Sequence, residues 1–438
     1  MTGNRTSASE VGTSGGSGMA PLHGTPLSDA RAGLDACVHC GFCMQSCPTY
    51  LALDDENDSP RGRLFLMRSM LEGTLSPDDP AARDHLDKCL GCRACETVCP
   101  SGVPYGHLLE ATRATLTQRH PLPLIARLML AVFARPVVMG AAMRAAQVMR
   151  SSRLGALFAW MLPGRLGTAL AMLEATRPAL KSRPYTAKGS GERGTVAVLE
   201  GCVMDGLYAR TNAATARTLT VNGYRCTAAE GQACCGALHA HAGDLASARK
   251  MAKRNIAAFE RSGADVIASN AAGCGAMLKE YGQLLASEPQ WADRAQRIAA
   301  KSRDVSELLA AAGPVEGGRL EMRVTYDAAC HLIHAQRLTA PPLAVLAAIP
   351  GLTLVPLVDA DQCCGAAGIY NLLEPNTSAA VLEPKLAHIA ATKADLVATG
   401  NPGCLMQIGA GLTREGSTTR VIHPVDLLDA SYSARTHS

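Results

Sequence analysis

The chain carries two copies of one cysteine pattern. The first copy reads Cys37-Val-His-Cys40-Gly-Phe-Cys43-Met-Gln-Ser-Cys47-Pro48, and the second reads Cys89-Leu-Gly-Cys92-Arg-Ala-Cys95-Glu-Thr-Val-Cys99-Pro100. Both match C-x2-C-x2-C-x3-C-P, the bacterial run that holds two cubane iron–sulfur clusters. Two-residue spacers let three thiolates reach three irons of one cube, whereas the fourth cysteine lies too far along the chain and reaches the other cluster.

This spacing predicts two [4Fe–4S] clusters with crossed ligand sets. Paired zinc sites or disulfides are the alternatives, but zinc usually shows two separated C-x2-C halves rather than a triple run closed by Cys-Pro. We expect Cys37, Cys40, Cys43 and Cys99 to bind one cluster, and Cys89, Cys92, Cys95 and Cys47 to bind the other.

A second group of cysteines recurs at near-constant offsets in the later part of the chain. The offsets are 128 from Cys202 to Cys330, 129 from Cys235 to Cys364 and 130 from Cys274 to Cys404, which indicates a tandem duplication. Four converging thiols per repeat can hold a further cluster or zinc, and the alternative is buried structural thiols. The candidate metal ligands are Cys202, Cys234, Cys235 and Cys274 in the first repeat, and Cys330, Cys363, Cys364 and Cys404 in the second.

Short apolar strands alternate with helical patterns around these later thiols, which is typical of an α/β sheet. In such sheets, ligands bind at the carboxyl ends of the strands, where these cysteines follow. Helices are expected at about residues 210–221 and 244–261. The expected strands are Thr195 to Leu199, Tyr224 to Ala228, Asp265 to Ser269, Met322 to Tyr326, Leu352 to Val358 and Asp395 to Thr399.

These elements indicate a multidomain α plus α/β protein. No nicotinamide, flavin or P-loop signature appears in a suitable context, so hydride chemistry is not expected of this chain. We predict a disordered Gly/Ser/Thr-rich tail at residues 1–28, a mainly helical ferredoxin-like domain at 29–118, a basic helical connector at 119–187, and tandem α/β domains at 188–312 and 313–438.

The net charge of +4 is unevenly distributed along the chain, and the connector is strongly basic. Between Arg119 and Lys188 there are eleven Lys or Arg residues and one acid, Glu174. Helical patterns at 122–135, 141–149 and 154–161 leave broad apolar faces between the arginines. Such helices can lie on an anionic membrane surface, giving peripheral membrane contact. We favour the alternative, a connector packed on its neighbours or on a partner subunit, because apolar helical faces are usually core.

Cysteine usage and hydropathy indicate the cellular compartment of the protein. Seventeen cysteines grouped for metal binding in a chain of 438 residues indicate a reducing compartment. No run of roughly 18 apolar residues appears, so we expect no transmembrane span. We therefore expect a cytoplasmic protein that is not secreted. Nucleic acid is not an expected partner, because no aromatic platform or reader motif accompanies the basic charge.

The later repeats resemble the cysteine-rich CCG domain of heterodisulfide reductases. The family pattern ends in C-x2-C, but this chain has Met277 and Gln407 at the last position. The whole order of motifs, over about residues 29–430, resembles the iron–sulfur subunit of bacterial glycolate oxidase. The segments that carry this likeness are Ser59-Pro-Arg-Gly-Arg63, Ala272-Gly-Cys274-Gly-Ala-Met277 and Gly400-Asn-Pro-Gly-Cys404-Leu-Met-Gln407.

This resemblance implies a complex in which a separate FAD subunit oxidises glycolate to glyoxylate. The chain would relay electrons toward an acceptor, membrane quinone, and would hold no catalytic residues of its own. Arg93, Glu96 and His39 are candidates for tuning the cluster potentials. The alternatives are the equivalent subunit of a lactate or an anaerobic glycerol-3-phosphate dehydrogenase, or a CCG-type disulfide reductase.

Overall fold

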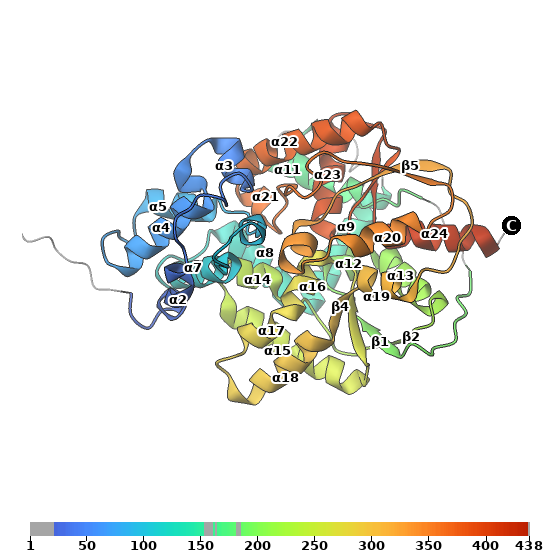
Figure 1. Cartoon of the computed structure of the whole chain (residues 1–438), viewed down its shortest axis with the longest axis horizontal. Helices are drawn as coiled ribbons and strands as arrows, with labels where there is room; N and C mark the ends of the chain where they lie inside the picture. The colour runs from blue at the N-terminus through green and yellow to red at the C-terminus, as the bar shows by residue number, and fades with distance from the viewer. Residues whose placement is uncertain (1–21, 153–160, 163, 181–184, 437–438) are drawn as a thin grey trace, which may run out of the picture.

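The structure is a computed structural model that describes residues 22–152, 161–162, 164–180 and 185–436. Figure 1 shows the N-terminal helices (blue) gathered at one end of the molecule, with the yellow helices of the first repeat and the orange to red helices of the second on opposite sides. Most of the ordered chain is helical, and two small parallel sheets lie within the later part. The predicted fold class, α plus α/β, is therefore confirmed.

Four of the short helices in the N-terminal part begin at proline. Ser59 and Asp79 cap two of these helices with their side chains, and proline follows each cap, which is a strong start signal. The elements are α1 (Pro26–Asp29), α2 (Arg31–Asp35), α3 (Pro48–Leu53), the 3-10 helix η1 (Glu56–Asp58), α4 (Pro60–Leu71), α5 (Pro80–Asp87), α6 (Ala94–Thr97) and α7 (Tyr105–Arg119).

The predicted tail was wrong at its C-terminal end. Leu22 and Leu27 are buried in the N-terminal hydrophobic core, and Thr25 forms a capping box that begins α1. Gly, Ser and Thr dominate the stretch before them, which concealed these two apolar anchors. The rest of the predicted tail, residues 1–21, lies outside the described residues.

The connector contains α8 (Leu124–Ala134), α9 (Pro136–Ser151) and α11 (Gly164–Ala175). The axes of α8 and α9 are bent by 103° at Arg135, where Pro136 starts the second helix. Within the described ranges, no single helix has the length and apolar content of a membrane span; α8 and α9 pass that test only as a bent pair. Most of the helix expected at 154–161 falls outside the described residues.

The two later repeats contain one parallel sheet each, with the same strand order. The first sheet runs β2-β1-β3-β4 and the second runs β6-β5-β7-β8, so the duplication seen in the cysteine offsets extends to topology. The strands are β1 (Thr195–Val198), β2 (Arg225–Thr227), β3 (Val266–Ser269), β4 (Ser302–Asp304), β5 (Met322–Tyr326), β6 (Leu352–Val355), β7 (Leu396–Ala398) and β8 (Arg420–Ile422).

Six of these strands were predicted, some with longer ends, whereas β4 and β8 were missed. Ser302-Arg-Asp and Arg420-Val-Ile are three-residue edge strands in which charged side chains interrupt any apolar run. Their neighbours in the sheet supply the hydrogen bonds that define them, and local sequence does not reveal those neighbours.

Helices cover both sheets, and the repeats share a core that includes Val196, Ala268, Val324 and Ala398. The helices of the first repeat are α12 (Val203–Leu207), α13 (Ala209–Val221), α14 (Ala237–His241), α15 (Leu245–Ser262), α16 (Ala272–Lys279), α17 (Tyr281–Leu284), α18 (Pro289–Lys301) and α19 (Val305–Ala312). Those of the second are the π-helix η2 (His331–Ala335), α20 (Ala340–Ala347), α21 (Tyr370–Leu373), α22 (Pro375–Thr392), α23 (Pro402–Arg414) and α24 (Pro424–Thr436).

A buried ion pair ties α22 to the end of β5. Lys385 Nζ lies 2.9 Å from Asp327 Oδ1, and both side chains are at most 2% exposed. Lys385 also donates to the carbonyls of Asp359 and Ala360, while Thr399 donates to Asp327 Oδ2. The two buried charges are thus paired within the second repeat.

We predict that Lys385→Met lowers the free energy of unfolding by about 3–5 kcal/mol, because Asp327 is left as an unpaired buried charge. Thermal unfolding of the full-length protein measures the change. Arg319→Met is the matched control: its pair with Glu321 is 72% and 70% exposed, so its loss should cost at most about 1 kcal/mol. Equal shifts for the two variants would contradict the prediction.

Candidate iron–sulfur and thiol sites

The first predicted cluster set lies at the protein surface. Cys37, Cys40, Cys43 and Cys99 line one small cavity. Cys40 is exposed, and the other three thiols are half-buried. His39 and Gly41 have positive φ values of 55° and 83°, so the chain turns sharply between successive thiols. Cys99 thus lies at the same cavity as the first trio, and Cys95 of the second run lines this cavity too.

The second predicted set is buried. Cys47, Cys89, Cys92 and Cys95 are each at most 9% exposed. Burial is the main cause that raises the pKa of Cys95, and the nearby thiols of Cys92, Cys89 and Cys47 raise it further. The four thiols thus interact electrostatically: a negative charge on one of them makes it harder to ionise the others.

The guanidinium of Arg63 supplies a positive charge to this buried group. Its side chain is inaccessible to solvent, and it donates to the His85 carbonyl at 2.6 Å, Thr49 Oγ1 at 3.0 Å and Asp58 Oδ1 at 3.1 Å. Burial alone would lower the pKa of Arg63, but the neighbouring negative groups, Cys89 and Cys47 among them, raise it. Arg63 thus remains a cation next to the second cysteine set.

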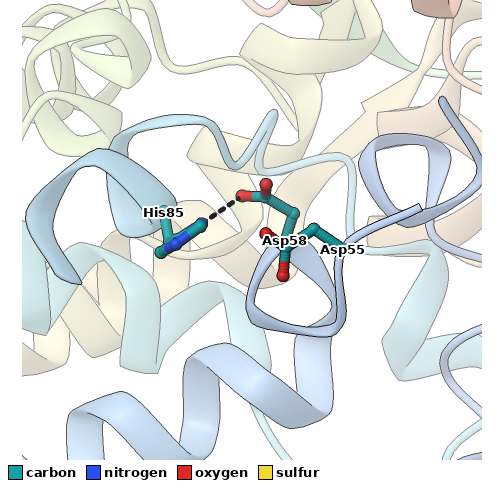
Figure 2. Close-up of side chains that lie close together, drawn as sticks. All are labelled: Asp55, Asp58 and His85. Atoms are coloured by element: carbon teal, nitrogen blue, oxygen red, sulfur yellow. Dashed lines mark ion pairs between the residues drawn. The ribbon is translucent and has the colours of Figure 1, made fainter. Parts of the chain in front are cut away.

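The Arg63 network includes the close group of Asp55, Asp58 and His85 (Figure 2). His85 Nδ1 lies 3.1 Å from Asp58 Oδ1, the oxygen that Arg63 also contacts. Asp55 accepts a hydrogen bond from the Asn57 amide. The carboxylate oxygens of Asp55 and Asp58 thus already have donors from the protein, so the group stabilises the packing of these segments. Gly62 lets α4 approach η1, because a Cβ there would lie 2.1 Å from the Glu56 carbonyl oxygen.

The thiols of the two later repeats meet at one cavity of about 390 Å³. In the first repeat, the Sγ atoms of Cys202 and Cys234 are 3.6 Å apart, and those of Cys235 and Cys274 are 3.2 Å apart. In the second repeat, Cys363 is the thiol neighbour that most affects the pKa of Cys330, and Cys404 is a thiol neighbour of Cys364. All eight candidate cysteines line this cavity. Cys226 does not, and it bonds to the Ala216 carbonyl instead.

A thiol contact connects the second cluster set to the second repeat. Cys92 and Cys363 lie in the same buried cluster, and the neighbouring thiol of Cys363 is the main cause that lowers the pKa of Cys92. The two residues share a small buried cluster with Leu90 and Tyr370. No sequence pattern indicated this contact, because the two cysteines are 271 positions apart and belong to different motifs.

Two of the expected tuning residues hold the domains together. Arg93 pairs with Glu96, with Nη2 and Oε2 2.9 Å apart, and also with Glu280 between α16 and α17. Glu96 in turn accepts from the Gly106 amide. On the other side, the Tyr370 hydroxyl donates to the Lys88 carbonyl. The second cysteine run is therefore anchored to both repeats.

Histidine side chains lie at the thiol cavity as well. The rings of His241 and His331 are stacked, with centroids 5.3 Å apart. His241 Nδ1 lies 2.7 Å from Glu110 Oε1. Burial, reinforced by His241 and Arg93, lowers the pKa of His331 to about 3. His239 is directed elsewhere, since its Nε2 bonds to the Leu130 carbonyl in α8.

The spacing of the thiols favours clusters over single zinc ions. A tetrahedral zinc with Zn–S bonds of about 2.3 Å requires sulfurs about 3.8 Å apart. Among the described residues, no three cysteine sulfurs lie within 4.8 Å of one another; Asp55, Asp58 and His85 are the only such group of metal-ligand types. The donor sets are all thiols, which fits iron–sulfur clusters.

Comparison with known proteins matches these sites to two domain families. Residues 33–103 match the 4Fe-4S dicluster domain, and residues 196–279 and 324–409 match the cysteine-rich domain. The probable glycolate oxidase iron-sulfur subunit of Bacillus subtilis (strain 168) is 38% identical over 90% of this chain and 92% of its own. The glycolate oxidase iron-sulfur subunit of Escherichia coli (strain K12) is 35% identical over 92% and 95%. The chain belongs to the glycolate oxidase iron–sulfur subunit family.

A shorter relative shares part of the chain. Lactate utilization protein A of Shouchella clausii (strain KSM-K16) is 33% identical over 54% of this chain and 98% of its own. Members of the glycolate oxidase family thus match this chain over a much longer stretch. The family's [4Fe–4S] domain agrees with the two cysteine runs described above.

The two positions that depart from C-x2-C have structural roles. Met277 is buried in the first-repeat core with Cys235. Gln407 donates to Ser378 Oγ at 2.9 Å and accepts from Asn371 Nδ2 at 2.8 Å. Each repeat therefore offers four thiols to the cavity, and neither substituted side chain is available as a fifth ligand.

We predict that Arg63→Met releases about half of the bound iron, because the second of two four-iron clusters loses its buried counter-charge. Iron and acid-labile sulfide per chain, with EPR after reduction, measure this loss. Arg63→Lys, which keeps the charge with fewer donors, should retain the iron but unfold at a lower temperature. Arg119→Met is the control, since its pair with Asp78 is 45% and 46% exposed. Full iron in Arg63→Met would contradict the counter-charge role.

Proposed function

We propose that this chain is the electron-transfer subunit of a complex that oxidises glycolate to glyoxylate. A partner subunit that contains FAD would take electrons from the substrate, and this chain would carry them through two [4Fe–4S] clusters to a quinone. The observation that carries the proposal is the contact between Cys92 and Cys363, which joins the ferredoxin-like region to the thiol cavity. The glycolate oxidase relatives, which match at least 90% of the chain, support the choice of substrate.

The proposed ligands follow the crossed sets of cysteines. Cys37, Cys40, Cys43 and Cys99 would hold the first cluster, and Cys47, Cys89, Cys92 and Cys95 the second. Each cluster supplies one-electron redox chemistry when bound. The eight cavity thiols, four from each repeat, would bind an additional cluster or act as redox thiols.

The order of burial supports a direction for the electrons. Cys40 is exposed, and its neighbours Val38 and Phe42 are 68% and 66% exposed, so the first set can meet a partner subunit. The second set is buried and touches the cavity. Electrons that enter at the first cluster would therefore pass inward to the second and then to the repeats.

The exposed side of the connector supports contact with the inner face of the cell membrane. Leu128, Val137 and Val148 are 59%, 86% and 68% exposed on α8 and α9. Arg127 and Arg144 are exposed on the same two helices, and Arg135 is exposed between them. Exposed apolar side chains among cations suit an anionic bilayer. The unpaired thiols suit the reducing cytoplasm.

We expect the anaerobically purified chain to contain at least about eight irons, as two four-iron clusters require. Iron, sulfide and zinc are measured per polypeptide. Cys92→Ser should lose about half of this iron, whereas Cys226→Ser should lose none, because Cys226 lies away from both sets. Twelve or more irons would add a cluster in the repeats. Fewer than about four in reconstituted protein would contradict the proposed ligands.

Glycolate provides the functional test of the same proposal. With the flavin subunits present, glycolate should bleach the cluster absorbance and produce the EPR signal of reduced clusters. Lactate and glycerol 3-phosphate are tested in the same way for comparison. Faster reduction of the clusters by either of them would identify that compound as the substrate in place of glycolate. Reoxidation of the reduced clusters by a disulfide but not by a quinone would favour a disulfide reductase instead.

We expect the triple variant Leu128→Ser, Val137→Ser, Val148→Ser to sediment at least about tenfold less with anionic phospholipid vesicles, because apolar burial provides much of the binding energy. Co-sedimentation at low and high salt measures binding, and salt should weaken the part due to arginines. Val358→Ser, which removes a 62% exposed valine from the second repeat, is the control. Binding equal to that of the parent chain would contradict membrane contact through these helices.

A further inference from the structure

The thiol cavity has an apolar side as well as a sulfur side. Its volume of about 390 Å³ lies within the range of small-molecule sites, roughly 300–1,000 Å³. Ala126, Met129 and Phe133 of α8 line it together with Leu238 and Ile369. These residues belong to one hydrophobic cluster that joins the connector to both repeats. A flat apolar ligand could therefore lie in the same cavity as the redox thiols.

The helix that covers this cavity also faces outward with apolar side chains. Ala126 and Leu130 of α8 are buried, whereas Leu124 and Leu128 are 68% and 59% exposed. One helix thus separates the cavity from the surface that we propose contacts the membrane. A lipophilic molecule in the bilayer would meet the cavity across a single layer of helix.

A histidine supplies a polar group for such a ligand. The carboxylate of Glu110 can only accept a hydrogen bond, so His241 Nδ1 carries the hydrogen and Nε2 is left for another partner. The stacked His331 also lines the cavity, but its ring already has a hydrogen-bonding neighbour in the Gly91 backbone. His241 Nε2 is therefore the nitrogen that this histidine pair offers to a ligand.

We infer that this cavity binds the ring of a quinone, with the ring against the apolar residues of α8 and α14 and an oxygen at His241. The inference rests on the proposed function, because the electrons must come from the clusters. Alternative acceptors fit less well. The apolar lining does not favour a charged soluble acceptor, and a disulfide would react at the thiols without requiring the apolar residues. A quinone would contact both the apolar side and the sulfur side of the cavity.

The redox step balances with the proposed activity. Conversion of one glycolate to glyoxylate releases two electrons and two protons. The quinone accepts both electrons, one at a time, and two O–H bonds form to give the quinol. The protons come from solvent, and the His241–Glu110 pair, 32% and 18% exposed, connects the cavity with solvent. No other oxidant or reductant is required.

The test uses the full-length chain with its clusters reduced by dithionite, so that it does not depend on glycolate. Decylubiquinone is added, and reoxidation of the clusters is followed by absorbance and EPR. Ala242→Trp should slow reoxidation at least tenfold, because Ala242 lines the cavity and a larger side chain fills it. Ala246→Trp, at an exposed position of the neighbouring helix α15, should reoxidise at the parent rate.

His241→Gln provides a second variant that does not fill the cavity. It should raise the decylubiquinone concentration for half-maximal reoxidation severalfold, while the EPR signal of the reduced clusters stays unchanged. Reoxidation at the parent rate in both Ala242→Trp and His241→Gln would overturn the inference. If Ala242→Trp blocks reoxidation by glutathione disulfide but not by the quinone, the cavity is a disulfide site and the inference is wrong.

A separate outcome identifies failure of the proposed function. If glycolate with the flavin subunits does not reduce the clusters, while the dithionite-reduced chain still reduces decylubiquinone through the cavity, the substrate proposal fails and the acceptor site is retained. If glycolate reduces the clusters but the cavity variants do not change their reoxidation by decylubiquinone, the acceptor site fails and the substrate proposal is retained.

Discussion

The buried guanidinium of Arg63 is the interaction on which the rest of the site depends. A group of four thiols at most 9% exposed is costly to ionise without a nearby positive charge. Arg63 provides that charge and also binds Thr49, Asp58 and the His85 carbonyl, which belong to three separate segments. The same side chain therefore neutralises the second cysteine set and fixes the loops around it. Without it, the set could be buried only as neutral thiols, which do not bind iron.

Burial of the second set allows direct contact with the repeats. Cys92 lies against Cys363, and Arg93, the next residue, pairs with Glu280 of the first repeat. Duplication of an α/β unit places the carboxyl ends of both sheets around the same cavity, so each unit supplies half of its thiols. A single unit would expose these sulfurs to solvent. The pair of units encloses them, and α8 covers part of the remaining apolar lining.

Much of the chemistry could be predicted from local sequence, because cluster ligands follow fixed spacings. The two runs at Cys37 and Cys89, and the offsets between Cys202 and Cys330, predicted the thiol groups and the duplicated topology. The start of the ordered chain was wrong, since Leu22 and Leu27 are isolated apolar residues in a Gly/Ser/Thr-rich stretch. The strands β4 and β8 were missed, because pairing with a neighbouring strand, rather than an apolar run, defines them.

These local sequence patterns could not predict long-range contacts. Arg63 was recognised as part of a motif, but its burial and its partners depend on how α4 packs against η1. The stacking of His241 on His331 joins residues from different repeats, and only the folded chain brings them to one cavity. Arg93 and Glu96 appeared to be tuning residues by their position, and the ion pair with Glu280 shows that they also fix the distance between domains.

The bend at Arg135 sets the positions of the two connector helices. A straight helix through Pro136 would lose a backbone hydrogen bond and would carry the apolar residues of α9 away from the protein. The 103° bend instead keeps α9 beside the first repeat, where Gln147 bonds to the Gly206 carbonyl. It also leaves Leu128 and Val137 exposed on adjoining helices, while Ala126 faces the cavity. The membrane surface and the acceptor site that we propose for this chain would therefore lie on opposite sides of α8, so that an acceptor dissolved in lipid would not need to cross water to reach the thiols.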